Sequence, residues 1–141
     1  MKIRFAKTED DITACYPVMS QLRSHITEKD FISRIYQQSQ HSGYQIAMAE
    51  NDGDIVSLAG FRISDNLAWG RFLYVDDLVT AEQHRGKGYG KQLLSWLREH
   101  ALANGCRQLH LDSGLPREDA HRFYIREGMT KAGYHFVENL T

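Results

Sequence analysis

The sequence has little proline and little cysteine, and each shortage excludes a class of protein. Pro17 and Pro116 are the only prolines among 141 residues. No proline-rich linker therefore divides the chain, and we expect one domain over residues 1–141. Cys15 and Cys106 are the only cysteines, which is too few for a disulfide-rich secreted scaffold. We predict that both are buried thiols.

Long charged runs and long apolar runs are also missing. The net charge is −1 and no basic run exceeds two residues, so we expect no nucleic-acid partner. No stretch approaches the ~20 apolar residues of a membrane span, and acidic residues follow Met1–Lys7 where a secretory signal would be apolar. We therefore predict a cytoplasmic protein without a membrane partner. The seven histidines show no short metal-ligand spacing, and no metal is predicted.

The spacing of apolar residues predicts an α/β fold. Apolar residues recur every three or four positions in the helical segments and every second position in the strands. We expect a mixed, mostly antiparallel central sheet with helices on both faces. The expected strands cover residues 3–5, 44–49, 55–61, 69–80, 108–112 and 132–137, with a hairpin turn at 51–54; the expected helices cover residues 9–22, 28–38, 89–103 and 117–127.

A glycine-rich turn follows the long strand over 69–80. It reads Arg-Gly-Lys-Gly-Tyr-Gly-Lys over residues 85–91 and opens a helix, so its backbone N–H groups converge at the positive end of the helix dipole. The absence of Cβ atoms lets a bulky anion approach the backbone. The spacing is not that of a Walker loop, because Gln92 follows Lys91, nor that of the dinucleotide fingerprint. The turn predicts a phosphate site; alone, it leaves an ordinary strand-to-helix connection open.

A second motif, Ala-His-Arg-Phe-Tyr-Ile-Arg-Glu-Gly-Met over residues 120–129, follows the turn. The two segments together resemble the GCN5-related N-acetyltransferase (GNAT) superfamily, strongly over residues 73–129. In that family the turn holds the pyrophosphate of acetyl-CoA, the co-substrate. The resemblance therefore implies cofactor contacts for Arg85, Gly86, Lys87, Gly88, Tyr89, Gly90 and Lys91.

The second motif implies the acid of the reaction. The family pattern is matched by Ala120, Phe123, Tyr124 and Gly128. Its tyrosine protonates the departing thiolate, so the resemblance implies Tyr124 as a catalytic residue; a core role for its ring is the alternative. Many members carry asparagine where this chain has Arg117, and we assign Arg117 no role.

The resemblance also implies roles for the strand before the turn. In the family this strand splays from its neighbour at a bulge, and its backbone groups bind the pantetheine arm and polarise the thioester carbonyl; Leu78, Val79 and Thr80 occupy that position. Strand alternation places Asp76 on the face of Leu78 and Thr80. We therefore predict Asp76 as the general base, with Asp77, a water relay, or a purely surface role for both acids left open.

The acceptor is the least determined part. The acid pair resembles the polyamine-acetylating branch, which implies a primary amine acceptor such as a polyamine or another small cationic amine, with Glu28 and Asp30 as further acids. A peptide or protein amine is an alternative, and so is a catalytically idle acyl-CoA-binding domain. A homodimer is compatible with the sequence.

Overall fold

The computed structural model describes all 141 residues, which form two compact units over residues 1–110 and 111–141. The first unit contains the first four strands, most of the fifth, and three α-helices. The second contains one helix and the C-terminal tail. A single domain over residues 1–141 stays a prediction. None of the helices combines the length and the apolar character needed to cross a membrane.

Five strands form one sheet in the order β1-β2-β3-β4-β5. Neighbours among the first four pair antiparallel, which confirms the mostly antiparallel sheet. The hairpin turn between β2 and β3 is also confirmed, because Asp52 and Gly53 both have positive φ, as a tight two-residue turn requires. The strands are β1 (Lys2–Phe5), β2 (Gln45–Asn51), β3 (Asp54–Asn66), β4 (Gly70–Thr80) and β5 (Gln108–Leu111).

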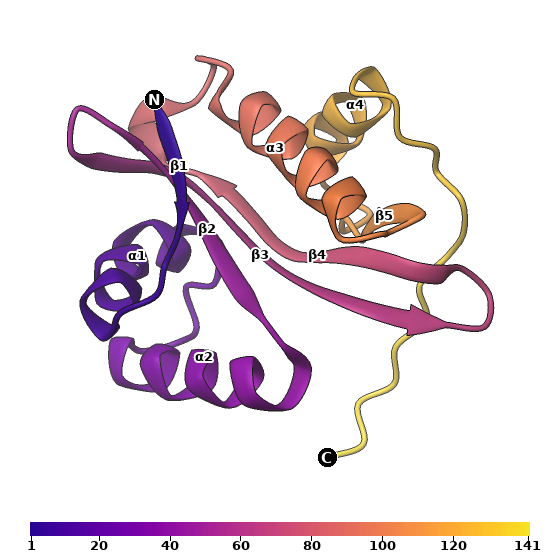
Figure 1. Cartoon of the computed structure of the whole chain (residues 1–141), viewed down its shortest axis with the longest axis horizontal. Coiled ribbons are helices and arrows are strands. Elements are labelled where there is room, and N and C mark those ends of the chain that lie inside the picture. The colour runs from indigo at the N-terminus through magenta and orange to yellow at the C-terminus, as the bar shows by residue number, and fades with distance from the viewer. The chain divides into compact units, whose positions relative to one another are not determined.

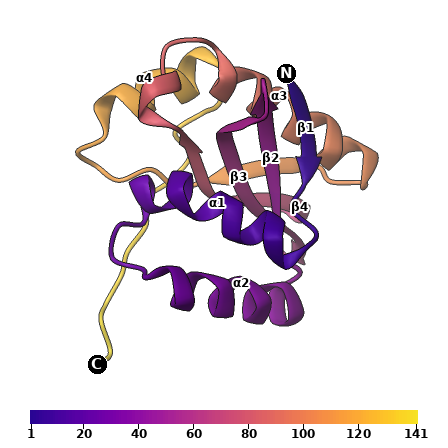
Figure 2. The same ribbon diagram turned by 90° about the vertical axis from the view of Figure 1, so that its left-hand side faces the viewer.

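Helices cover both faces of the sheet (Figure 1 and Figure 2). The helices α1 (Glu9–Leu22) and α2 (Glu28–Ser42) lie on one face, and α3 (Tyr89–Ala103) lies on the other. The short 3-10 turn η1 (Glu82–His84) connects β4 to the glycine turn before α3. The apolar stripe of each helix predicts this arrangement, because burial of that stripe against the sheet is the main favourable term in folding.

Two separate cores hold these layers together. Under α1 and α2, the buried residues include Cys15, Met19, Phe31, Ile46 and Leu58. On the α3 face the fully buried leucines of α3 lie in the same layer as an aromatic group formed by Phe5, Phe61, Trp96 and His100. Both cysteines are buried free thiols, as predicted.

The start of α1 is fixed by a capping box and an ion pair. The Thr8 hydroxyl accepts a hydrogen bond from the Asp11 amide, and the Asp11 carboxylate accepts one from the Thr8 amide. The same carboxylate accepts two bonds from Arg4 of β1. Arg4 therefore holds the pKa of Asp11 well below its usual range, and α1 is joined to the edge strand.

A β-bulge interrupts the pairing of β3 with β4. Gly60 pairs with Asp77, but the next residue, Phe61, pairs with Val75. Asp76 is therefore an extra residue on β4 with no partner on β3, and the alternation of side chains shifts at this point. The bulge places Asp76 and Asp77 on the same face of the sheet.

The bulge corrects one expectation from the sequence. Val79 packs in the core under α1 and α2, so its neighbours Leu78 and Thr80 face the opposite side of the sheet. Asp76 faces the side of α1 and α2, where it meets Arg62. Asp76 therefore does not share a face with Leu78 and Thr80, because simple alternation fails across an inserted residue.

The second unit contains α4 (Glu118–Arg126) and an extended tail. The helix lies within one residue of its predicted bounds. The predicted strand over residues 132–137 is wrong, because these residues form no strand, and Tyr134, Phe136 and Val137 are exposed. An alternating pattern specifies which face of a strand is apolar, but a strand also needs a neighbour for its backbone hydrogen bonds.

Candidate functional site

The glycine turn has the open backbone that a phosphate cradle requires. Gly86 and Gly88 have φ of +78° and +84°, in the left-handed region that favours glycine. A Cβ added at either position would meet no atom of the chain within 4 Å. The space in front of these two residues is therefore available to a ligand.

The N-terminus of α3 differs from those of α1 and α2. Thr8 and Thr27 cap the two earlier helices through their side chains, and acidic residues occupy the first turns. Helix α3 instead begins at Gly88 without a side-chain cap and without an acid in its first turn. The first backbone N–H groups of α3 lack intrahelical acceptors, so they remain free to bind an anion.

The charged side chains of the turn are exposed around this helix end. Arg85, Lys87 and Lys91 all lie at the surface, and Tyr89 is held by a bond of 2.9 Å that the Asn51 side chain donates to its hydroxyl. The arrangement combines free amides, open glycine positions and positive charge. These are the features that an anionic ligand requires, and the pyrophosphate contacts expected of residues 85–91 stay a prediction.

The end of β4 is joined to this turn by the short 3-10 turn η1. The backbone of Leu78–Thr80 is paired with β3, and the Thr80 carbonyl oxygen accepts a bond of 3.2 Å from Arg85. The Ser57 hydroxyl donates to the Val79 carbonyl oxygen at 3.0 Å. The predicted cofactor segment on β4 therefore lies beside the glycine turn and is connected to it through Arg85.

A hollow with a volume of about 380 Å³ lies between α1, α2 and the strands β3 and β4. Its size falls in the usual range for small-molecule sites. Both predicted acids, Asp76 and Asp77, line it. Glu28 and Asp30 do not line it. We name it the acid hollow; its other lining residues are Met19, Arg23, His25, Ile26, Phe31, Arg34, Ile35, Gln38, Ser42, Tyr44 and Arg62.

Asp77 is held by two partners from outside β4. Its carboxylate accepts a bond of 2.8 Å from Arg23 Nε at the end of α1 and one of 2.6 Å from the Tyr44 hydroxyl. Burial and the negative charge of Asp77 raise the pKa of Tyr44 well above its ordinary value, so this phenol remains a hydrogen-bond donor. Asp77 is therefore a fixed acceptor at the floor of the acid hollow.

Asp76 is held by a bidentate pair with Arg62 of β3. The guanidinium donates from Nε and Nη2 to the two carboxylate oxygens at 2.9 and 3.0 Å. Arg62 also lies over the Tyr74 ring, 5.0 Å from its centre, and Arg23 donates to the Asp76 carbonyl oxygen at 2.9 Å. Protonation of Asp76 would disrupt a charge-assisted pair.

Sequence reasoning missed these partners. Arg23 is 54 positions from Asp77, and Tyr44 is 33 positions from it, so no local spacing could identify them. Arg62 is closer to Asp76, at 14 positions, but only the register of β3 against β4 brings the pair together. A signal did exist in the glycine at position 60, because a glycine inside a strand often marks a bulge or a close approach of another group.

Gly60 provides space for the Tyr44 hydroxyl. A Cβ at this position would lie 1.7 Å from that oxygen and 2.9 Å from Asp77 Oδ2. We expect Gly60→Ala to lower the free energy of unfolding by about 1–3 kcal/mol, the usual cost of overpacking a core, as measured by urea denaturation. Gly133→Ala is the control, because a Cβ there meets nothing within 4 Å. Equal stability of both variants would contradict this expectation and show that the Tyr44 side chain can move away from position 60 without lowering the free energy of unfolding.

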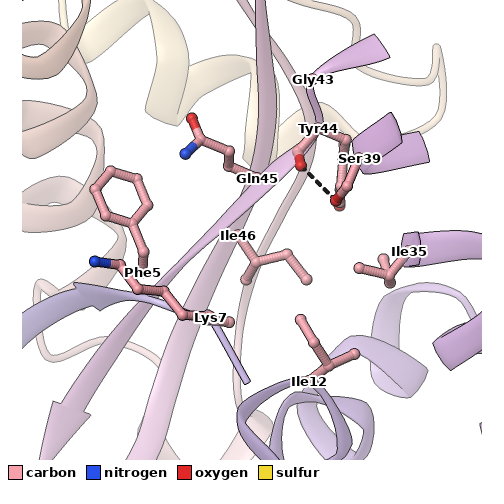
Figure 3. A pocket seen from close by; sticks show the side chains of 10 residues that line it. Phe5, Lys7, Ile12, Ile35, Ser39, Gly43, Tyr44, Gln45 and Ile46 are labelled. Atoms are coloured by element: carbon pink, nitrogen blue, oxygen red, sulfur yellow. Dashed lines mark hydrogen bonds between the residues drawn. The ribbon is translucent and has the colours of Figure 1, made fainter. Parts of the chain in front are cut away.

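A second hollow, of about 420 Å³, lies where β1 and β2 meet α1 and α2 (Figure 3). Ile12, Ile35 and Ile46 point toward its centre. The Ser39 hydroxyl donates to the Tyr44 carbonyl oxygen at 2.8 Å on its wall. No carboxylate and no residue of the glycine turn lines it, so it lacks the groups that amine chemistry needs.

Tyr124 lies on α4 in the second unit. Its ring packs edge-on against Phe123, with 5.4 Å between ring centres. Burial raises the pKa of Tyr124, while the charge of Arg117 lowers it. Arg117 occupies the N-cap position of α4 and makes no side-chain cap bond. The phenol is thus kept protonated at neutral pH, as an acid requires.

Comparison with known proteins then decides the family, because the model of the acetyltransferase (GNAT) family matches residues 5–129. The chain belongs to the acetyltransferase (GNAT) family. It is therefore an N-acetyltransferase that depends on an acyl-CoA donor, and the sheet with helices on both faces is the GNAT fold, as predicted. No group of three or more histidine, cysteine, aspartate or glutamate side chains could hold a metal ion.

Several GNAT relatives match nearly the whole chain. It is 33% identical over 130 residues to the uncharacterized N-acetyltransferase YhdJ of Bacillus subtilis, with 92% of each chain covered. It is 27% identical to the aminoalkylphosphonate N-acetyltransferase of Salmonella typhimurium, with 99% of this chain and 91% of the relative covered. The structure resembles the aminoglycoside N-acetyltransferase AAC(6')-Iy solved with CoA, with a TM-score of 0.85, 15% identity, and 98% and 93% coverage; this likeness shows the fold alone.

Proposed function

We propose that this GNAT protein transfers the acetyl group of acetyl-CoA to the primary amine of a small molecule. The observation that carries the proposal is the uncapped N-terminus of α3, which opens on glycine and is joined to the acid-bearing strand β4 by η1 and the glycine turn. Free amides at this end provide an anion site, and the two acids upstream provide a site for an ammonium group. The anion site and the ammonium site therefore lie within residues 76–91, on one continuous segment of the chain.

In this proposal the turn and the end of β4 hold the donor. The amides of residues 86–91 bind the pyrophosphate, and Arg85, Lys87 and Lys91 neutralise its charge. Bound acetyl-CoA supplies an activated thioester carbonyl. The backbone of Leu78–Thr80 stabilises the negative charge that develops on the carbonyl oxygen, and Tyr124 donates its proton to the departing thiolate.

The acids act on the acceptor. A primary amine with a pKa near 10 is almost wholly protonated at pH 7 and cannot attack until it loses a proton. Asp76 is the proposed base, with Asp77 or a water relay as alternatives. Because both Asp76 oxygens already accept bonds from Arg62, the geometry supports a second role as well, in which Asp76 holds the ammonium by its charge.

The size of the acceptor follows from the acid hollow. A volume of about 380 Å³ suits a small molecule, and the relative in Salmonella typhimurium is named for aminoalkylphosphonates. A polyamine stays a prediction, with less support than before, because both acids of the hollow already pair with arginines. A cytoplasmic location and a homodimer also stay predictions.

A thiol-release assay tests the proposed function. Purified protein is mixed with acetyl-CoA and, in separate reactions, with small primary amines, peptides or polyamines, and free coenzyme A is measured. Amine-dependent thiol release supports the proposal. Binding of acetyl-CoA without thiol release from any acceptor would identify an idle acyl-CoA-binding domain, and release with peptides alone would identify a peptide N-acetyltransferase.

Substitution of Asp76 separates its two roles. With Asp76 as the base, we expect the kcat/KM of Asp76→Asn to fall most below the pKa of the amine and to recover at high pH, where free amine is abundant. If Asp76 instead holds the ammonium by its charge, the KM for the amine rises about tenfold or more across the pH range, because a lost negative charge weakens ammonium binding.

Asp65→Asn is the matched control. Asp65 also pairs with an arginine of the β3–β4 hairpin, Arg71, at 3.3 Å, but it is exposed and lies outside the acid hollow. We expect wild-type kinetics from this variant. A wild-type pH profile and KM for Asp76→Asn would contradict both roles and direct attention to Asp77.

A further inference from the structure

We propose that the acid hollow selects an acceptor that carries an acidic group, a phosphonate, phosphate or carboxylate, in addition to its primary amine. This inference rests on the proposed function and names the substrate class of the same site. It follows from the balance of charge and of hydrogen-bond donors along the walls of the hollow.

The charge of the lining is positive. Three arginines, Arg23, Arg34 and Arg62, face two aspartates, Asp76 and Asp77. These five side chains leave a net charge of +1 on the lining. An amine without an acidic group would bring its own positive charge into a hollow that already carries a positive excess.

The hydrogen-bond donors are also in excess. Arg23 donates from Nε to the Asp77 carboxylate and from Nη2 to the Asp76 carbonyl oxygen, and Arg62 donates from Nε and Nη2 to the Asp76 carboxylate. The Nη1 group of each arginine makes no bond in the chain. Arg34 pairs with no acid at all and retains its five N–H donors. Each carboxylate oxygen in the hollow already accepts a bond. The hollow therefore offers spare donors, which an anion would satisfy.

The unpaired arginine and the two aspartates lie on different walls of the acid hollow. Arg34 lies on α2, whereas Asp76 and Asp77 lie on β4, directly before the segment Leu78–Thr80 proposed to contact the thioester. An acceptor that places its ammonium at β4 would direct its other end toward α2. A polyamine would place a second ammonium there, where the lining provides arginine and no acid.

Four acceptors of equal chain length test the inference. Propylamine, 1,3-diaminopropane, β-alanine and 2-aminoethylphosphonate each present a primary amine on a short chain. Their other ends are neutral, cationic (the second amine of the diamine), carboxylate and phosphonate, respectively. We expect kcat/KM at least tenfold higher for the two acidic amines than for propylamine, and lowest for the diamine. The ratio of the two acidic amines distinguishes a carboxylate site from a phosphonate site.

Variants locate the anion site. Arg34→Gln should lower kcat/KM for the acidic amines about tenfold or more and weaken the binding of 2-aminoethylphosphonate to the coenzyme A complex in calorimetry. Lys29→Gln is the control, because it removes one positive charge from the same helix at an exposed residue outside the hollow. It should leave both measurements at wild-type values.

The outcomes separate this inference from the proposed function. Acetylation of propylamine or the diamine at rates equal to the acidic amines would overturn the inference and leave the N-acetyltransferase intact. A preference for acidic amines that survives Arg34→Gln would also overturn it, because the anion would then bind elsewhere. No acetylation of any amine would overturn both.

Discussion

Gly90→Val is expected to abolish coenzyme A binding while the protein stays folded. Gly90 is in the first turn of α3, where the backbone is helical, and valine has a higher helix propensity than glycine, so the branched side chain is added without loss of helix propensity. That side chain would occupy the space in front of the free amides, where we place the pyrophosphate. Calorimetric titration with coenzyme A measures the loss, and circular dichroism verifies the fold.

Gly88→Val should have the same effect on binding, with an added cost in stability. Its φ of +84° is strained for any residue with a Cβ. Gly43→Val controls for this strain, because Gly43 has a φ of +67°, also meets nothing within 4 Å, and ends α2 away from the turn. Unchanged affinity in folded Gly88→Val and Gly90→Val would remove the glycine turn from the cofactor site.

Tyr124→Phe is expected to lower turnover about 10²- to 10⁴-fold, the usual contribution of a placed acid, and to leave coenzyme A affinity unchanged. The ring keeps its packing against Phe123, and only the proton donor is removed. Because burial raises the pKa of this phenol, it is protonated throughout the neutral range. Wild-type activity that depends on it should decline only above the ordinary tyrosine pKa of about 10.

Tyr134→Phe is the control for the loss of a phenol, since Tyr134 lies in the same unit and is 83% exposed. It should retain wild-type turnover. Steady-state rates and a coenzyme A titration for both variants decide the question. Wild-type turnover in Tyr124→Phe would contradict the acid role and assign the tyrosine to packing, with the thiolate leaving unprotonated or through water.

The parts of the fold that sequence predicts well are those specified by neighbours along the chain. The helices and most strands follow from apolar spacing, and the turn over residues 85–91 follows from glycines within one segment. The surroundings of Asp76 and Asp77 depend on strand register and on two distant residues, Arg23 just after α1 and Tyr44 just before β2. Contacts between residues far apart in the sequence produce no periodic pattern, so the arginine partners could not be predicted from the sequence.

The incorrect face assigned to Asp76 and the incorrect strand over residues 132–137 have related causes. Both rest on alternation along one segment, which is valid only while each residue has a counterpart on an adjacent strand. At Asp76 the counterpart is missing from β3. Over residues 132–137 no ladder forms at all. The alternation of residue types indicates which side chains would share a face of a strand. Pairing with a neighbouring strand determines whether that strand forms and which way its side chains face.

Because of the bulge, residue 76 is a single inserted residue in β4 that could be deleted without changing the pairing of its neighbours. Val75 and Asp77 pair with consecutive residues of β3, so deletion of residue 76 would leave a regular ladder with both cores in their present register. The charge lining the acid hollow could therefore change by one through a single-residue deletion, without repacking either layer. Because residue 76 is also the proposed base, the same deletion would change acceptor binding and proton transfer together while the pairing of β3 with β4 is kept.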